Sequence, residues 1–379
     1  MPNLSRMNSR SLSVDFLRGC SILLVIITHG FFNMSLLGLD RILPAQNFTI
    51  LRSNGYLGVS IFFVISGFLI TSSLLNRNNQ SPNDEDTVAL KFELSSFYAK
   101  RIGRLFPPLI LLFVISVVLS YIGGIYLLDF ELQPKLLFFT AAFHAFTFTY
   151  NGYYLGLGGS TPGLRHFIPL WSLAIEEVFY LVWPILLKGL KSTRLILVFL
   201  GVLIIFAPAY RIEHGYISQY HYLGCVDMLA LGSLVAFLRK SAKISKIANR
   251  AIFLLPVTLL VIFFVLCVVD IDEHFVIAPS LVGGLTGFYL LLSNNFDQRT
   301  ARVIYFKYLV SPLSLLGMLS YEVYLFHLMF MNIFYRLDFN NGTNYLSGPV
   351  PLVSLMLFSY FLHRFLFEPT RIKLTKYLK

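Results

Sequence analysis

The chain alternates between long apolar segments and short polar or basic ones. Most of the apolar segments approach the roughly 20 residues that an α-helix needs to cross a hydrocarbon core about 30 Å thick. This pattern predicts an all-α fold, a polytopic membrane helical bundle of about ten transmembrane helices that forms one membrane-embedded domain over residues 1–379. The expected spans are 14–34, 56–75, 105–128, 171–187, 194–210, 220–238, 251–270, 275–293, 313–335 and 350–367.

Composition supports an integral membrane protein and excludes an ordinary soluble domain. Hydrophobic residues make up 56% of the chain and charged residues 13%, and the mean hydropathy is +0.71. The three cysteines, Cys20, Cys225 and Cys267, lie inside apolar segments and are expected to be small core residues, so neither a disulfide nor a metal site is predicted. The net charge of +11 comes from basic residues in the loops between spans, so no nucleic-acid partner is expected.

Residues 134–150 are apolar and aromatic but short, and the distribution of basic residues decides how they are interpreted. If they do not cross the membrane, 24 of the 30 Lys and Arg residues fall on the side of the N terminus. Cytoplasmic loops carry an excess of Lys and Arg. We therefore expect both termini to be cytoplasmic in the inner membrane, and 134–150 to be a re-entrant or interfacial segment on the outer side.

The first segment that carries candidate chemistry joins Arg18 to His29 inside one apolar span. Eleven helical steps rise about 16 Å, so His29 would lie near or just past the middle of the membrane if Arg18 lies at its boundary. An ionisable side chain at that depth is costly and is usually there for function. The alternative is a structural histidine that is hydrogen-bonded between packed helices.

A basic cluster stands directly before the third span, in Phe97–Pro107. Arg101 and Arg104 are three residues apart and would share a helix face, and guanidinium groups suit phosphate oxygens. The alternative is an ordinary cytoplasmic basic cluster that binds lipid headgroups. In the preceding span, Gly58–Leu69 contains small residues that indicate close packing of helices.

Two adjacent carboxylates, Glu176 and Glu177, lie in Trp171–Tyr180, a little over one turn inside an apolar span. The topology puts them about 8 Å below the outer boundary. Adjacent helical residues point about 100° apart, so only one of the two needs to face a site. The alternative is an ion pair with an arginine of a neighbouring helix, because a buried carboxylate needs a partner.

The last motif, Ser320–His327, lies in the ninth span. Tyr324 and His327 are three residues apart, and counting from Pro312 puts His327 at about 22 Å, a depth similar to that of the glutamates. Packing is the default role for the tyrosines. Asp227 is a further lone acid, in the sixth span.

Together these segments resemble acyltransferase family 3, the polytopic membrane proteins that O-acylate sugars and other small molecules. Arg18 and His29 fit the Arg-x10-His pattern of that family, and the four other segments resemble its further signatures in the same order. Lys100 departs from the family pattern because an Arg is common there, and Cys225-Val-Asp227 stands where many members have Arg-x-Asp. We expect no hydrolase-like extracellular domain after the last span, so the chain is expected to resemble the stand-alone members.

The resemblance implies a membrane O-acyltransferase with acyl-CoA, expected to be acetyl-CoA, as the donor. It implies that the donor phosphates meet Arg101 and Arg104, together with Arg18. It also implies that His29 acts as general base or as acyl-carrying nucleophile, two roles that the sequence does not separate. Either Glu176 or Glu177 would orient His29 or balance its charge.

The implied acceptor is a hydroxyl of a cell-surface glycan or lipid-linked sugar that enters from the outer side past residues 129–170. Trp171, Tyr324 and His327 are the candidates for substrate contact, and membrane lipids surround the protein. No metal is expected, because no group of His, Cys and carboxylate residues has ligand spacing. Two rival functions remain, a proton-coupled transporter or polysaccharide exporter and a non-catalytic partner in an envelope assembly complex. The sequence leaves the oligomeric state open.

Overall fold

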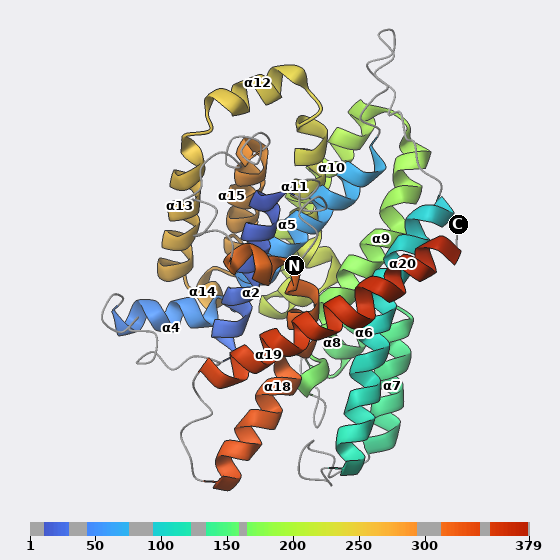
Figure 1. Cartoon of the computed structure of the whole chain (residues 1–379). Coiled ribbons are helices and arrows are strands. Elements are labelled where there is room, and N and C mark those ends of the chain that lie inside the picture. Colours follow the sequence, from blue (N-terminus) through green and yellow to red (C-terminus); the bar gives the residue numbers. More distant parts are fainter. Residues whose placement is uncertain are drawn as a thin grey trace.

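The computed structural model describes residues 11–29, 44–75, 94–122, 134–158, 165–293, 312–341 and 349–377, and all statements below concern these residues. They form helices and connecting turns, with no strand among them, so the predicted helical bundle is confirmed (Figure 1). The elements are α2 (Leu12–Thr28), α4 (Ala45–Ser53), α5 (Gly55–Leu74), α6 (Leu94–Ile122), α7 (Pro134–Phe146), α8 (Tyr150–Gly156), η3 (Arg165–Phe167), α9 (Leu170–Leu190), α10 (Thr193–His214), η4 (Tyr216–Tyr220), α11 (Tyr222–Leu238), α12 (Ala242–Arg250), α13 (Leu254–Val268), α14 (Ile271–His274), α15 (Ala278–Leu292), α18 (Ser320–Asn341), α19 (Pro349–Leu362), the π-helix η6 (His363–Phe367) and α20 (Glu368–Tyr377).

The helices make this a multi-pass membrane protein. By length and composition, five helices in the described part of the chain can cross a membrane, or seven if each of two bent helix pairs is one span. Two shorter apolar helices, α13 and α15, accompany them. A helix occupies each of the ten expected spans in whole or in part, and the number that crosses the bilayer stays a prediction.

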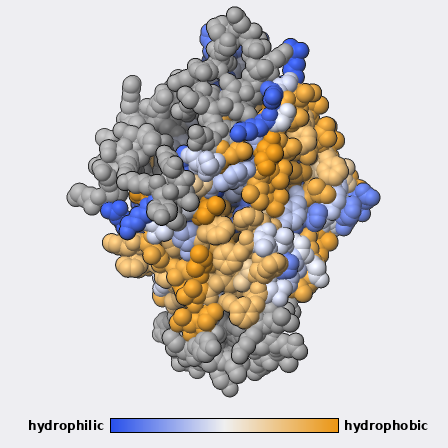
Figure 2. Space-filling view, turned by 90° about the vertical axis from the view of Figure 1, so that its right-hand side faces the viewer, coloured by the Kyte–Doolittle hydropathy of each residue, from blue (hydrophilic) through white to orange (hydrophobic). Residues whose placement is uncertain are grey.

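Apolar side chains on the outside of the bundle face the membrane. Ile110 and Val114 of α6, Phe139 and Phe143 of α7, and Ile185 of α9 are each about half to two-thirds exposed. Figure 2 shows apolar residues over much of the described surface on the side of α6, α7 and α9. In water this surface would be a strong aggregation liability, whereas lipid tails cover it without cost.

At the centre of the bundle, α5 packs closely against α11. A Cβ atom at Gly67 would collide with the backbone of Leu229, and one at Gly232 would collide with the backbone of Val64. Small residues allow two helix backbones to approach, which is how helices associate where no hydrophobic effect drives them together. The packing role expected for the Gly58–Leu69 segment, which contains Gly67, is therefore confirmed.

The segment 134–150 forms one short helix, α7, and ends where a second short helix, α8, begins. The 13-residue α7 rises about 20 Å, less than the hydrocarbon thickness, and lies alongside α6 (Figure 1). Phe148, with φ of 62°, separates it from α8, which packs against α9. These lengths agree with a segment that does not cross, and its depth in the membrane stays a prediction.

The expected ninth span, 313–335, is broken, which corrects the straight helix assumed from the sequence. The helix Pro312–Met318 meets the next helix, Ser320–Phe334, at an angle of 83°. A Cβ atom at Gly317 would overlap the backbone of Asp15, so the short first helix lies directly on α2 before the chain turns into α18. The count of about 22 Å along a straight helix therefore does not give the depth of His327, which stays untested.

The partner of Asp227 is an arginine from another helix. The Arg211 guanidinium of α10 donates to both carboxylate oxygens of Asp227 in α11, at 3.2 and 2.9 Å, and to the Ser280 hydroxyl of α15 at 2.6 Å. Arg211 and Asp227 are both fully buried. Arg211 thus supplies a cation to Asp227, although Cys225 replaces the arginine common two positions before this acid.

Candidate functional site

The main candidate site is a small cavity of about 50 Å³ between α2, α5, α6, α9 and α18. Four of the nine residues singled out from the sequence line it, namely Arg18, Arg104, Glu176 and Tyr324. The full lining is Arg18, Val59, Phe62, Phe63, Ser66, Arg104, Leu105, Ser172, Leu173, Glu176, Tyr180, Ser320, Tyr321 and Tyr324.

Helical spacing explains why these residues meet. On α9 the cavity is lined at intervals of four residues, by Ser172, Glu176 and Tyr180. Residues four apart in a helix lie on the same face. The same rule brings Phe62 and Ser66 of α5 to the cavity, so each helix contributes one stripe to the site.

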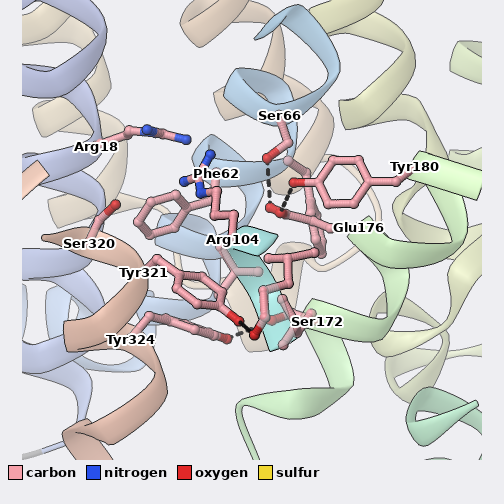
Figure 3. A pocket seen from close by; sticks show the side chains of 14 residues that line it. Arg18, Phe62, Ser66, Arg104, Ser172, Glu176, Tyr180, Ser320, Tyr321 and Tyr324 are labelled. Carbon is pink, nitrogen blue, oxygen red and sulfur yellow. Dashed lines mark hydrogen bonds between the residues drawn. The ribbon is translucent and has the colours of Figure 1, made fainter. Parts of the chain in front are cut away.

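The two cations of the cavity, Arg18 and Arg104, make no direct polar contact with any side chain that the structure describes. Figure 3 shows the Arg18 and Arg104 guanidinium groups extending into the same cavity as the Glu176 carboxylate. Among the described residues, neither guanidinium forms a hydrogen bond or a salt bridge, and Nε of Arg18 is buried without a partner. Two close, partly desolvated positive charges favour an anion between them. The site therefore fits an anionic ligand.

Two hydroxyl groups hold the carboxylate that faces these cations. Ser66 donates to Oε1 of Glu176 at 2.7 Å, and Tyr180 donates to Oε2 at 2.9 Å. Both carboxylate oxygens thus accept a hydrogen bond, which fixes the orientation of the group. Sequence reasoning had assigned neither Ser66 nor Tyr180 to the site. For Tyr180 the signal was present, because it follows Glu176 by one helical turn.

The cavity corrects the expected depths of its residues. The sequence put the arginines at the inner boundary and Glu176 about 8 Å below the outer one, yet they line a single cavity. One reason is that α6 begins at Leu94, so Arg104 lies about 15 Å along the helix and not in the loop before it.

Arg101 lies elsewhere, although it shares α6 with Arg104. Its guanidinium carbon lies 4.9 Å from the ring centroid of Tyr180 and 5.3 Å from that of Phe97. Arg101 is not among the residues that line the cavity. The two arginines of the predicted donor site are therefore separated, one facing the cavity and one placed over aromatic rings.

The two predicted histidines meet. His29 follows the last residue of α2, and its ring centroid lies 4.9 Å from that of His327, edge to face. Nδ1 of His29 donates to the Val25 carbonyl at 2.7 Å, and Nδ1 of His327 donates to the Tyr324 carbonyl at 2.5 Å. A carbonyl can only accept, so each neutral ring carries its free lone pair on Nε2.

Tyr324 connects the histidines with the cavity. Its ring centroid lies 5.5 Å from that of His327, and its hydroxyl shares a hydrogen bond of 2.7 Å with Ser172. Both Tyr324 and Ser172 line the cavity. The Arg18 and Arg104 guanidinium groups therefore share a cavity with the hydroxyl groups of Ser172 and Tyr324, and the Tyr324 ring contacts the histidine pair.

Glu177 and Trp171 lie outside the cavity lining. Glu177 is 3% exposed, and its Oε1 has no hydrogen-bond partner among the described residues. Trp171 stacks on Tyr56, with ring centroids 5.9 Å apart, and meets Tyr220 edge to face at 5.0 Å. Only one of the adjacent glutamates lines the cavity, as their helical spacing predicted. In the described part of the chain, no cluster of His, Cys, Asp and Glu residues could hold a metal ion.

Comparison with known proteins now identifies the chain. The model of the acyltransferase domain family, acyltransferase family 3, matches residues 11–363. The chain belongs to this family. No solved structure matches this acyltransferase domain.

Curated relatives of this family-3 chain include O-acetyltransferases. It is 28% identical over 344 residues to the peptidoglycan O-acetyltransferase OatA of Listeria monocytogenes, covering 83% of this chain and 48% of that protein. It is 29% identical over 313 residues to the O-acetyltransferase OatA of Staphylococcus aureus, covering 75% of this chain and 47% of that protein. A putative peptidoglycan O-acetyltransferase of Bacillus subtilis, YrhL, is 33% identical over 181 residues, 46% of this chain and 23% of that protein. The chain spans about half the length of the OatA relatives.

Proposed function

We propose that this protein is a membrane O-acetyltransferase that moves an acetyl group from acetyl-CoA to a hydroxyl of a cell-envelope glycan. The observation that supports the proposal is the pair of guanidinium groups, Arg18 and Arg104, in one cavity within an acyltransferase domain, where no described residue forms a hydrogen bond or salt bridge with them. Coenzyme A is rich in phosphate, and arginine is the side chain best matched to phosphate oxygens.

In this proposal the donor phosphates bind Arg18 and Arg104, and the pantetheine arm extends past Tyr324 toward the histidines. Arg18 and His29 are separated by about 16 Å of helix, a distance that a long flexible arm can cover. The cavity of about 50 Å³ has room for a few water molecules, so donor binding must displace some lining side chains.

His29 then serves as general base. Its Nε2 takes the proton of the acceptor hydroxyl while the hydroxyl oxygen attacks the thioester carbonyl carbon. The new C–O bond forms, the C–S bond breaks, and the thiolate of coenzyme A leaves and takes up a proton. The hydrogen bond from Nδ1 to Val25 supports this role, because it keeps the lone pair on Nε2. Attack by Nε2 itself, with the acetyl group carried on His29, uses the same lone pair.

The proposed acceptor is a glycan such as the peptidoglycan named for the relatives from Listeria and Bacillus. The decisive experiment uses purified protein, acetyl-CoA labelled in the acetyl group and a soluble peptidoglycan fragment. We expect free coenzyme A and labelled fragment in equal amounts. A proton-coupled carrier or an exporter would leave the thioester intact, and so would a non-catalytic assembly partner.

We also propose that the protein lies in the cytoplasmic membrane with both termini on the cytoplasmic side, on the basis of the 24 basic residues assigned to that side out of 30. The helix α12, which crosses one end of the bundle in Figure 1, carries three of these basic residues, Lys243, Lys246 and Arg250. A cysteine introduced at the exposed Lys243 should resist an impermeant thiol reagent in intact cells and react after lysis. Labelling of this cysteine in intact cells would show that α12 lies on the outer side and would contradict the proposed orientation.

A further inference from the structure

Arg101, the arginine of the basic cluster that does not line the cavity, still touches a residue that does. Its guanidinium lies over the ring of Tyr180, 4.9 Å from the centroid, and beside Phe97 at 5.3 Å. Both distances are within the range of a cation–π interaction, which strengthens when the cation is withdrawn from water. Arg101 is partly buried, whereas its neighbour Lys100 is exposed.

Tyr180 links Arg101 to the cavity through its contact with Glu176. Its ring lies under Arg101, and its hydroxyl donates to Oε2 of Glu176 at 2.9 Å. The other carboxylate oxygen accepts from Ser66 at 2.7 Å. A tyrosine that shifts in its plane moves its hydroxyl with it, so the cation that covers the ring determines where the hydroxyl meets the carboxylate.

From these contacts we propose that Arg101 is a positioning residue, which holds the Glu176 carboxylate opposite Arg18 and Arg104 by fixing Tyr180, and does not itself bind the donor. The two arginines, three residues apart on α6, thus have different roles. Arg104 binds the ligand, and Arg101 keeps the Glu176 carboxylate in place opposite Arg104. This inference rests on the proposed function, because it concerns the same cavity.

Transfer kinetics and donor affinity, measured separately, test this division. Arg101→Ala should lower kcat by roughly 5- to 30-fold, the loss expected for a partly buried cation–π contact. The dissociation constant for coenzyme A should change by less than about threefold, whereas Arg104→Ala should raise it at least about tenfold. Arg101→Lys should recover most of the rate, because an ammonium can also cover the ring. Lys100→Ala, which removes a neighbouring exposed charge, should behave like the wild type.

A double-mutant cycle with Tyr180→Phe gives the sharper test. That variant keeps the ring and removes the hydroxyl that holds Glu176, so adding Arg101→Ala to it should cause little further loss. Losses that multiply, or a coenzyme A affinity that falls as far in Arg101→Ala as in Arg104→Ala, would overturn the inference.

One readout is independent of turnover. The carboxylate band of Glu176, isolated as an infrared difference against Glu176→Gln, should shift in Arg101→Ala and show no additional shift when Tyr180→Phe is already present. An unmoved band would overturn the inference even if the protein transferred no acetyl group. Lack of transfer by the wild-type protein would contradict the proposed function alone.

Discussion

Replacing His29 by alanine should reduce acetyl transfer by roughly 10²–10⁴-fold, the usual contribution of a positioned general base. Coenzyme A binding and protein yield should stay near the wild-type level, because the arginines proposed to bind phosphate lie elsewhere and the His29 side chain is not fully buried. His29→Gln should be equally impaired, since an amide can form hydrogen bonds but cannot accept the proton. Turnover of labelled acetyl-CoA, normalised to folded protein, measures both effects.

His274→Gln is a suitable control, because His274 is exposed on α14 and far along the chain from the motifs of the site. It should transfer at the normal rate. A folded His29→Gln protein with normal transfer would remove His29 from catalysis. In that case His327, whose ring centroid lies 4.9 Å from that of His29, would become the next candidate.

The second large effect should come from the donor site. Each of Arg18 and Arg104 is expected to contribute charge-assisted hydrogen bonds to phosphate worth about 1.5–3 kcal/mol. Arg18→Ala combined with Arg104→Ala should therefore weaken coenzyme A binding by roughly 10²–10⁴-fold. Titration of the purified protein with coenzyme A would measure this loss, and lysine at either position should restore only part of it.

Removal of two exposed arginines provides the matched control for charge. Arg52→Ala with Arg250→Ala lowers the net charge equally, at exposed positions of α4 and α12, two helices that contribute no residue to the cavity lining. It should leave coenzyme A binding within a few-fold of the wild type, with its salt dependence little changed. Equal losses in both double variants would mean that the protein attracts coenzyme A only through its overall charge.

Hydropathy and charge spacing predicted much of this molecule. The helices lie where apolar runs of membrane length occur, because every backbone polar group within a bilayer must be satisfied inside its own helix. The motif residues Arg18, Arg104, Glu176 and Tyr324 were found singly, and the structure brings them to one cavity. Helical spacing also predicted that one adjacent glutamate would face it, and Glu176 is the one.

The remaining features depend on contacts between segments far apart in the chain. No periodicity shows that the expected span 313–335 bends by 83°, because the bend lies beside a contact with a distant segment, that of Gly317 with the backbone of α2. The separation in depth expected between the arginines and Glu176 failed for a similar reason, since counting along one helix ignores where a neighbouring helix begins. The pairing of His29 with His327, about 300 residues apart in sequence, likewise required the fold.

The Arg211 network bears on how the chain is inserted during synthesis. Arg211 stands in the last turn of α10, its partner Asp227 comes 16 residues later, and Ser280 comes 69 residues later. At about 5–20 residues per second, roughly 3–14 s separate the emergence of this cation from that of its last partner. Until then the guanidinium can reach the membrane interface from the helix end. The hydrogen-bond network that Arg211 of α10 and Asp227 of α11 begin is therefore completed only when α15 has been inserted. The rate of synthesis limits how early these three helices can pack together.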